Sequence, residues 1–269
     1  MRYVFAIFIF TIFSCQSKYL HVKFPPTITG ERLTGSAFYD SVKKMGWKER
    51  EAIALPQLLN GNIPAFVLKF VAIHTSIVDS ATGKTITAAY YVSPDYVSIG
   101  TNEDWARLPL TPMAAQTLAD TLHCFLPTRK MVNDIYGQAQ VKLAPVPLYA
   151  FRDSSVIMYH HHLIIEGQRK GMPGLIAGIK KDVVISDKLT KSDKKDREAI
   201  YGWHQLNGQA IQPLYTGHVN WWVDYSHGIR LVYRTITVDG KEMDYIEVMK
   251  NPILKRLLSD EAFSDVYRY

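Results

Sequence analysis

The hydrophobic pattern of this chain changes near residue 140, and this change constrains the fold more than any other feature. Before it, apolar residues recur at spacings of three and four over Ser36 to Lys44 and over Trp47 to Leu59, which predicts two helices. After it, short apolar segments are separated by turn residues, which predicts strands. Strands and helices do not alternate regularly, so the predicted class is α+β, with helices mainly in the N-terminal half and a largely antiparallel sheet in the C-terminal half.

Capping residues and turn dipeptides place the remaining elements. Thr111-Pro112 predicts a helix reaching about Phe125, and Leu126-Pro127-Thr128 starts another that ends near Ala139. Asn207-Gly208 and Asp239-Gly240 predict hairpin turns, because these residues tolerate positive φ. Strands are expected over Ala65–Ile77, Thr85–Ile99, Val156–Glu166, Leu175–Ser186, Glu198–His204, Gly228–Val238 and Asp244–Val248, and a last helix over Pro252–Leu258.

The N-terminus is typical of an export signal. One positive charge at Arg2 precedes an apolar run from Tyr3 to Phe13, which is shorter than the roughly 20 residues needed to span a bilayer as a helix. We therefore expect a signal peptide over residues 1–15, a tether over 16–26 and a single globular domain over 27–269. A subdivision of that domain near residue 140 is the alternative.

The end of this signal, Ile12-Phe-Ser-Cys15, resembles a bacterial lipobox. The resemblance implies that Cys15 is lipidated and that the protein is held at the cell envelope of a Gram-negative bacterium, in the periplasm or at the surface, with an ordinary secretory signal as the alternative. Cys124 is then the only other cysteine, which excludes an intramolecular disulfide. The domain must depend on its hydrophobic core for stability.

The net charge of +6 permits an anionic partner such as an acidic glycan or a lipid headgroup. The lysines are scattered, however, and the densest run, Lys188 to Arg197, also contains Asp193 and Asp196, which is typical of a solvated loop. An exported protein also has no ready access to nucleic acid, so no nucleic-acid partner is expected.

Candidate chemistry concentrates between Tyr201 and Arg230. The predicted catalytic residues are His204, His218, Asp224, Ser226 and His227. Histidine can act as a general base near neutral pH or as a ligand of a divalent metal such as zinc, so His204, His218 and His227 are the candidate metal ligands. The alternative is that these histidines stabilise loops and strand ends through hydrogen bonds.

The segment Ser226-His-Gly-Ile-Arg230 resembles the catalytic Ser-His-Gly-Cys-x-Arg segment of the YkuD-type L,D-transpeptidases, which act on peptidoglycan. Ile229 stands where that family has its nucleophilic cysteine and one more residue, and neither His218 nor His204 has the spacing of the family's upstream histidine. The resemblance therefore implies a shared turn rather than a shared activity. The C-terminal half also resembles exported bacterial proteins of no assigned activity.

Further residues are predicted to bind or convert a substrate. Ser226 could act as a nucleophile only with a distant histidine as base, since His227 points to the opposite face of a strand. Glu166 with Asp224 could form the acid and base pair of a glycosidase. Aromatic, cationic and polar side chains complete the candidate substrate-binding set: Arg230, Trp203, Trp222, Tyr225, His161 and Glu166.

These features favour a hydrolase of an envelope or extracellular polymer, peptidoglycan or polysaccharide, that uses a His/Asp centre. The alternative is a lipoprotein that binds glycan or peptidoglycan through the same aromatic residues without turnover.

Overall fold

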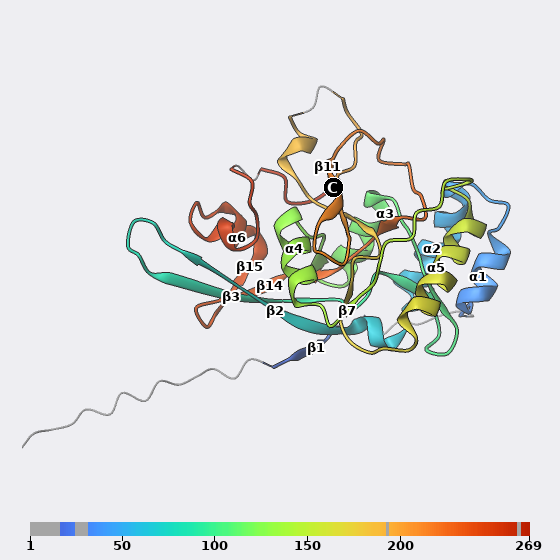
Figure 1. Cartoon of the computed structure of the whole chain (residues 1–269), viewed down its shortest axis with the longest axis horizontal. Helices are drawn as coiled ribbons and strands as arrows, with labels where there is room; N and C mark the ends of the chain where they lie inside the picture. Colours follow the sequence, from blue (N-terminus) through green and yellow to red (C-terminus); the bar gives the residue numbers. More distant parts are fainter. Residues whose placement is uncertain (1–16, 25–31, 192–193, 263–264) are drawn as a thin grey trace, which may run out of the picture.

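The computed structural model describes residues 17–24, 32–191, 194–262 and 265–269 (Figure 1). The predicted signal peptide and Cys15 lie outside these ranges. The helices are α1 (Gly35–Ser41), α2 (Trp47–Leu59), α3 (Pro112–Thr121), α4 (Arg129–Gln138), α5 (Ser155–Arg169) and α6 (Tyr245–Lys250), with 3-10 turns η1 (Ala65–Leu68), η2 (Asp187–Leu189) and η3 (Leu254–Leu257). Among the described residues, no helix is long and apolar enough to cross a membrane.

The strands form one larger sheet and several smaller ones. They are β1 (Tyr19–His21), β2 (Lys69–Val78), β3 (Thr85–Val92), β4 (Ser98–Gly100), β5 (Trp105–Arg107), β6 (Cys124–Phe125), β7 (Val141–Lys142), β8 (Ile176–Ala177), β9 (Lys181–Val183), β10 (Ile200–His204), β11 (Ala210–Tyr215), β12 (His227–Gly228), β13 (Val232–Tyr233), β14 (Thr235–Val238) and β15 (Lys241–Asp244). The larger sheet has the order β1-β2-β3-β13-β6, with β14 pairing β3 and β15, and all of its pairs are antiparallel. A second sheet has the order β11-β10-β9-β12, in which β12 pairs with β9 in parallel.

The predicted α+β class is confirmed. In the described part of the chain, four of the six α-helices precede residue 140 and nine of the fifteen strands follow it. One hydrophobic cluster includes side chains from Val22 to Leu258, so residues on both sides of position 140 pack together. Figure 1 shows α1, α2 and α5 together on one side of the molecule and the long β2–β3 hairpin extending from the other.

Capping signals correctly predicted several helix starts. α2 has the predicted bounds, and the Thr111 and Thr128 side chains accept hydrogen bonds from Ala114 and Met131 at the starts of α3 and α4. Asp239 and Gly240 both have positive φ and form the two-residue turn between β14 and β15.

The strand predicted over Val156–Glu166 is wrong, because this segment is the helix α5. Ser154 caps the helix by accepting a hydrogen bond from Ile157 N, and the buried positions Met158, Ile165 and Arg169 recur at helical spacing. The strand predicted over Asp244–Val248 is also wrong, since Asp244 ends β15 and caps α6.

The predicted tether contains a strand. Tyr19–His21 forms β1, which pairs with Val71, Phe70 and Lys69 at the edge of the larger sheet. This part of residues 16–26 is therefore attached to the domain by backbone hydrogen bonds.

Cys124 lies in β6 and is buried. Burial raises the pKa of its thiol, which keeps the sulfur protonated and unreactive at neutral pH.

Candidate functional site

The segment that carries most of the predicted site residues runs from the surface into the interior. Trp221 is 45% exposed and Trp222 is half-buried, whereas every residue from Val223 to Arg230 is buried. The inner part is fixed by β12, which pairs with β9 at Lys181 and Asp182. The polar residues of this segment made it the candidate site, but the local sequence did not predict that their side chains are sealed from solvent.

Asp224 organises the turn that leads into β12. Its Oδ1 accepts hydrogen bonds from the backbone N and the Oγ of Ser226, at 2.7 and 2.5 Å, and its Oδ2 accepts one from Nη2 of Arg152 at 2.6 Å. Burial alone would raise the pKa of Asp224, but His227, Ser226 and Arg152 lower it to about 2. Asp224 is therefore ionised at neutral pH.

The hydroxyl of Ser226 is occupied by this turn. Its Oγ donates to Asp224 and is fully buried, so it points neither to a histidine nor to solvent. The arrangement is that of a turn-stabilising serine and differs from an activated nucleophile, which needs a general base within hydrogen-bond distance.

His227 lies between two carboxyl groups. Its Nδ1 is 3.6 Å from Oε1 of Glu198, and its Nε2 is 3.9 Å from Oδ1 of Asp224. Within the described ranges, neither ring nitrogen and neither Glu198 oxygen has a hydrogen-bond partner. The side chains of Glu198, Asp224 and His227 are all buried. Burial of such groups lowers the stability of the fold unless they are neutral or linked by water.

The protonation states of Glu198 and His227 follow from that burial. Loss of solvent and the nearby Asp224 raise the pKa of Glu198 to about 9, although Lys181 opposes the shift. Burial lowers the pKa of His227 to about 4, against the opposing effect of Asp224. At neutral pH the cluster therefore contains a protonated Glu198, a neutral His227 and an ionised Asp224.

The three candidate histidines do not share one centre. The His218 ring lies edge-on to His227, with centroids 5.9 Å apart, but His204 stacks on Tyr136 of α4 and its Nε2 is 3.0 Å from Oδ1 of Asn133. In residues 17–24, 32–191, 194–262 and 265–269, no group of three or more His, Cys, Asp or Glu side chains is placed to hold a metal ion. In this part of the chain the candidate metal ligands His204, His218 and His227 are therefore not brought to one centre.

Arg230 is a structural cross-link rather than a substrate-binding residue. It is fully buried, donates to the carbonyl oxygens of Ser93 and Ile176 at 2.8 and 2.7 Å, and lies over the Tyr96 ring at 4.2 Å. A guanidinium with these contacts cannot reach a ligand at the surface.

The two candidate substrate-binding residues on α5, His161 and Glu166, make polar contacts away from Asp224 and His227. His161 is fully buried, and its Nδ1 lies 3.2 Å from Nζ of Lys180. Because burial lowers the pKa of His161, its neutral ring accepts the hydrogen bond. Glu166 accepts a hydrogen bond from Arg107 at 2.7 Å, whereas Asp224 pairs with Arg152, so the two carboxylates predicted to form an acid and base pair have separate arginine partners.

Trp203 and Tyr225 are core residues. Trp203 is 6% exposed and Tyr225 is 1% exposed, and the Tyr225 hydroxyl accepts a hydrogen bond from the backbone N of Leu148 at 2.5 Å. These two candidate substrate-binding residues are therefore not open to a ligand at the surface.

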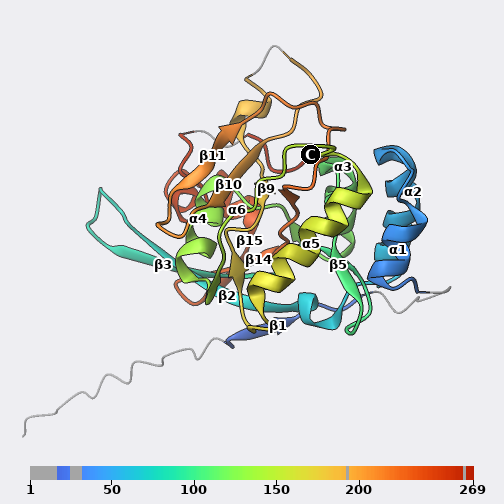
Figure 2. The ribbon, with the colours of Figure 1, turned by 45° about the vertical axis from the view of Figure 1, so that its right-hand side comes forward.

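Trp222 does reach a cavity. A hollow of about 530 Å³ is lined by the end of the α1–α2 loop, the start of α2, the residues before α5 and the segment that leads to Asp224. We call it the tryptophan groove, and its lining residues are Lys43, Lys44, Met45, Gly46, Trp47, Asp153, Ser154, Trp221, Trp222 and Val223. Figure 2 shows α1, α2 and α5, whose ends border the groove, on the same side of the molecule.

Seven of the ten residues that line this groove lie outside the segment from Tyr201 to Arg230 that the sequence singled out. Lys43 and Lys44 lie in the α1–α2 loop and Trp47 begins α2, so they approach Trp221 and Trp222 only through the tertiary fold. Trp47 could have been noticed as a large aromatic residue at the first position of a predicted helix, where helical periodicity does not require burial. Glu198, which faces His227, could have been noticed as an acidic residue that begins a predicted buried strand.

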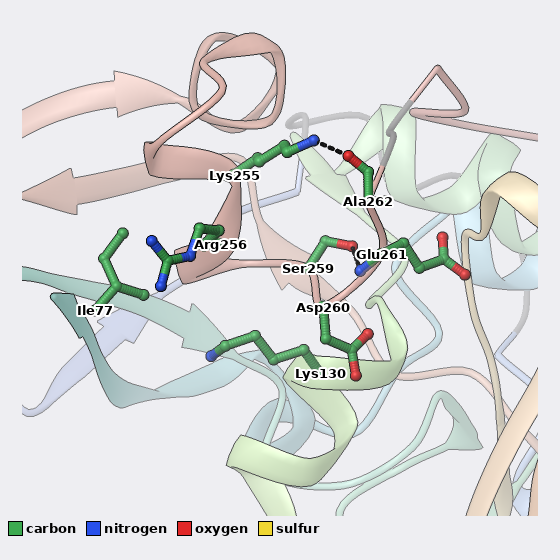
Figure 3. Close-up of a pocket in the computed structure, with 8 residues that line it drawn as sticks. All are labelled: Ile77, Lys130, Lys255, Arg256, Ser259, Asp260, Glu261 and Ala262. Carbon is green, nitrogen blue, oxygen red and sulfur yellow. Dashed lines mark hydrogen bonds between the residues drawn. The ribbon is translucent and has the colours of Figure 1, made fainter. Parts of the chain in front are cut away.

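A separate pocket of about 500 Å³ lies beside α4 and η3 (Figure 3). Its cationic side chains already have partners: Lys130 Nζ is 2.7 Å from Oδ2 of Asp134, and Lys255 Nζ donates to the carbonyl oxygen of Ala262. None of the candidate catalytic or substrate-binding residues lines this pocket, whereas Trp222 lines the tryptophan groove.

Comparisons with protein-family models, with curated proteins and with solved structures find no match to this chain.

Proposed function

We propose that this chain is an exported, lipid-anchored envelope protein that binds a glycan of the cell envelope, peptidoglycan or polysaccharide, at the tryptophan groove without converting it. One observation carries the proposal: three of the five tryptophans of the chain line a single cavity. Indole rings combine a flat apolar face with a polar edge, which suits the stacked faces and hydroxyl groups of sugars. The groove also has the size of ligand-binding pockets, roughly 300–1,000 Å³.

The position of the N-terminal strand supports this proposal. β1 begins four residues after Cys15 and lies at the lower edge of the molecule in both views, whereas the helices that border the groove lie to the right and above it (Figures 1 and 2). In the proposed arrangement, a lipid on Cys15 would be attached through a strand that does not line the groove.

Replacing Trp221 by alanine tests the proposal. Trp221 is 45% exposed, so its removal should leave the fold intact but lower glycan affinity about tenfold or more, as removal of an aromatic contact residue does. The measurement is co-sedimentation of the purified soluble domain with peptidoglycan sacculi and with insoluble neutral polysaccharide. Tyr19→Ala is the matched control, because Tyr19 is 39% exposed and lies on β1, away from the groove. Equal binding by both variants and the unmodified domain would refute the proposal.

Hydrolysis of the same polymer is the second candidate, and one observation favours it. Glu198 and Asp224 have pKa values displaced in opposite directions, to about 9 and about 2, which is the pattern of an acid and base pair. Both carboxyls are buried, so catalysis would require the segment from Trp221 to Asp224 to open.

The hydrolase candidate predicts that the unmodified domain releases soluble fragments from sacculi and that Glu198→Gln abolishes the release. Glutamine cannot donate the proton of a carboxylic acid but has nearly the same shape. Chromatography of the supernatant measures the fragments. Absence of release by the unmodified domain between pH 5 and pH 8 would leave binding as the remaining candidate.

A further inference from the structure

A second hollow adjoins the tryptophan groove. It has a volume of about 330 Å³ and lies between α1 and the first turns of α5. Its lining residues are Ser36, Tyr39, Asp40, Lys43, Val156 and Tyr159. Lys43 lines both cavities, so the two hollows meet at this side chain.

The second hollow offers aromatic and apolar surface. The rings of Tyr39 and Tyr159 stack with centroids 5.2 Å apart at an angle of 25°, and the Tyr39 hydroxyl donates to the carbonyl oxygen of Arg107 at 2.7 Å. This hydrogen bond fixes the buried Tyr39 ring, against which the half-buried Tyr159 is held. Val156 is 56% exposed at the rim. The surface is therefore preformed rather than dependent on a mobile side chain.

The charges along the two hollows balance. Lys43 Nζ is 2.7 Å from Oδ1 of Asp40, and the other ionised groups of the lining are Lys44 and Asp153. Two ammonium groups thus accompany two carboxylates. An acidic polymer would gain attraction from the lysines and meet repulsion from the aspartates, whereas an uncharged chain can use all four groups as hydrogen-bond donors or acceptors.

From this geometry we infer that the two hollows form one extended site for an uncharged saccharide chain, with the Lys43–Asp40 pair at the junction between two subsites. This inference rests on the proposed function and adds the class of ligand and its direction, from Trp47 and Trp221 across Lys43 to Tyr159. Together the hollows exceed the space that one ring needs, so a longer oligomer should contact both.

Oligomer length provides the test. Affinity is measured by calorimetry with uncharged β-linked N-acetylglucosamine oligomers of two and of five or six units, at low and at high salt. The longer oligomer should bind the unmodified domain at least tenfold more tightly, and salt should change neither affinity, because no net charge is neutralised on binding. Equal affinity for both lengths, or tighter binding of an acidic oligomer that weakens with salt, would overturn the inference.

Two variants separate this inference from the proposed function. Val156→Asp places a charge in the second hollow and suits the fold, because an acidic residue in the first turn of α5 interacts favourably with the helix dipole. It should remove the advantage of the longer oligomer while the shorter one binds as before. Leu163→Asp is the control, since Leu163 is 49% exposed on the same helix but lines neither hollow. If neither length binds but the protein still co-sediments with sacculi or polysaccharide, the extended site for an uncharged chain fails and the proposed function stands. If none of these ligands binds, the proposed function itself fails. If both lengths bind equally well, only the extended site fails.

Discussion

Replacing Glu198 by glutamine should stabilise the protein at alkaline pH. In the folded chain the pKa of Glu198 is raised from its ordinary 4.5 to about 9, so folding takes up a proton across this range. The sign follows from linkage: a group with a raised folded pKa contributes fully at low pH, and its contribution declines as pH rises from about 4.5 to about 9. Glutamine keeps the neutral amide shape at every pH and avoids this loss.

The size of the effect can be bounded from the same shift. One pKa unit corresponds to about 1.4 kcal/mol, so the 3.5 units between the ordinary pKa of 4.5 and pH 8 set an upper bound of about 5 kcal/mol. Because a buried site relaxes when its carboxyl ionises, we expect Glu198→Gln to increase the free energy of unfolding at pH 8 by about 3 kcal/mol. Near pH 5 the two proteins should differ little. Urea unfolding at the two pH values measures the difference. Glu242→Gln, an exchange at an exposed position of β15, should have no effect at either pH. A variant that is less stable than the unmodified protein at pH 8 would show that Glu198 is ionised in its buried position.

The fold was predictable where local sequence decides structure. The sequence predicts the helix starts at Thr111 and Thr128 and the bounds of α2. Capping and helical periodicity depend only on residues within a few positions of each other. α5 was not predicted, because its apolar residues and three consecutive histidines resemble a strand when the capping role of Ser154 is overlooked. The helix forms because Met158 and Ile165 pack into the interior from one face.

The candidate site was predictable only in part, for a different reason. Trp222, a candidate substrate-binding residue, lines a cavity, and Asp224 and His227 lie close together. Whether a polar side chain is open to solvent depends on what covers it. The residues that shield Asp224 from solvent, such as Glu198 and Arg152, are distant in the sequence. No local sequence pattern connects them to Asp224. Trp47 likewise lines the groove from the other half of the chain, and no local pattern connects it to Trp221 and Trp222.

Asp224→Ala should have the second large effect, acting on stability and on the groove together. The substitution removes the acceptor for Ser226 N, Ser226 Oγ and Arg152 Nη2, and it leaves the two buried Ser226 donors without a partner. Losses of this kind cost about 1–3 kcal/mol for a neutral group and more for a charged one, so we expect the free energy of unfolding to fall by about 3 kcal/mol.

Asp224→Ala should also weaken glycan binding at the tryptophan groove. Trp221 and Trp222 directly precede Asp224, so releasing the turn allows both rings to leave their positions, and glycan affinity should fall even at temperatures where the variant remains folded. Thermal unfolding and co-sedimentation with sacculi measure the two effects. Ser226→Ala, which removes only one hydrogen bond, should cost about 1 kcal/mol and preserve binding. If Asp224→Ala lowers stability but binds glycan normally, the turn does not position the tryptophans. The pKa of Asp224 is lowered from its ordinary 3.8 to about 2, so the unmodified protein should lose stability as the pH falls from about 4 toward 2. If stability does not fall over this range, Asp224 is not the ionised acceptor that holds the turn.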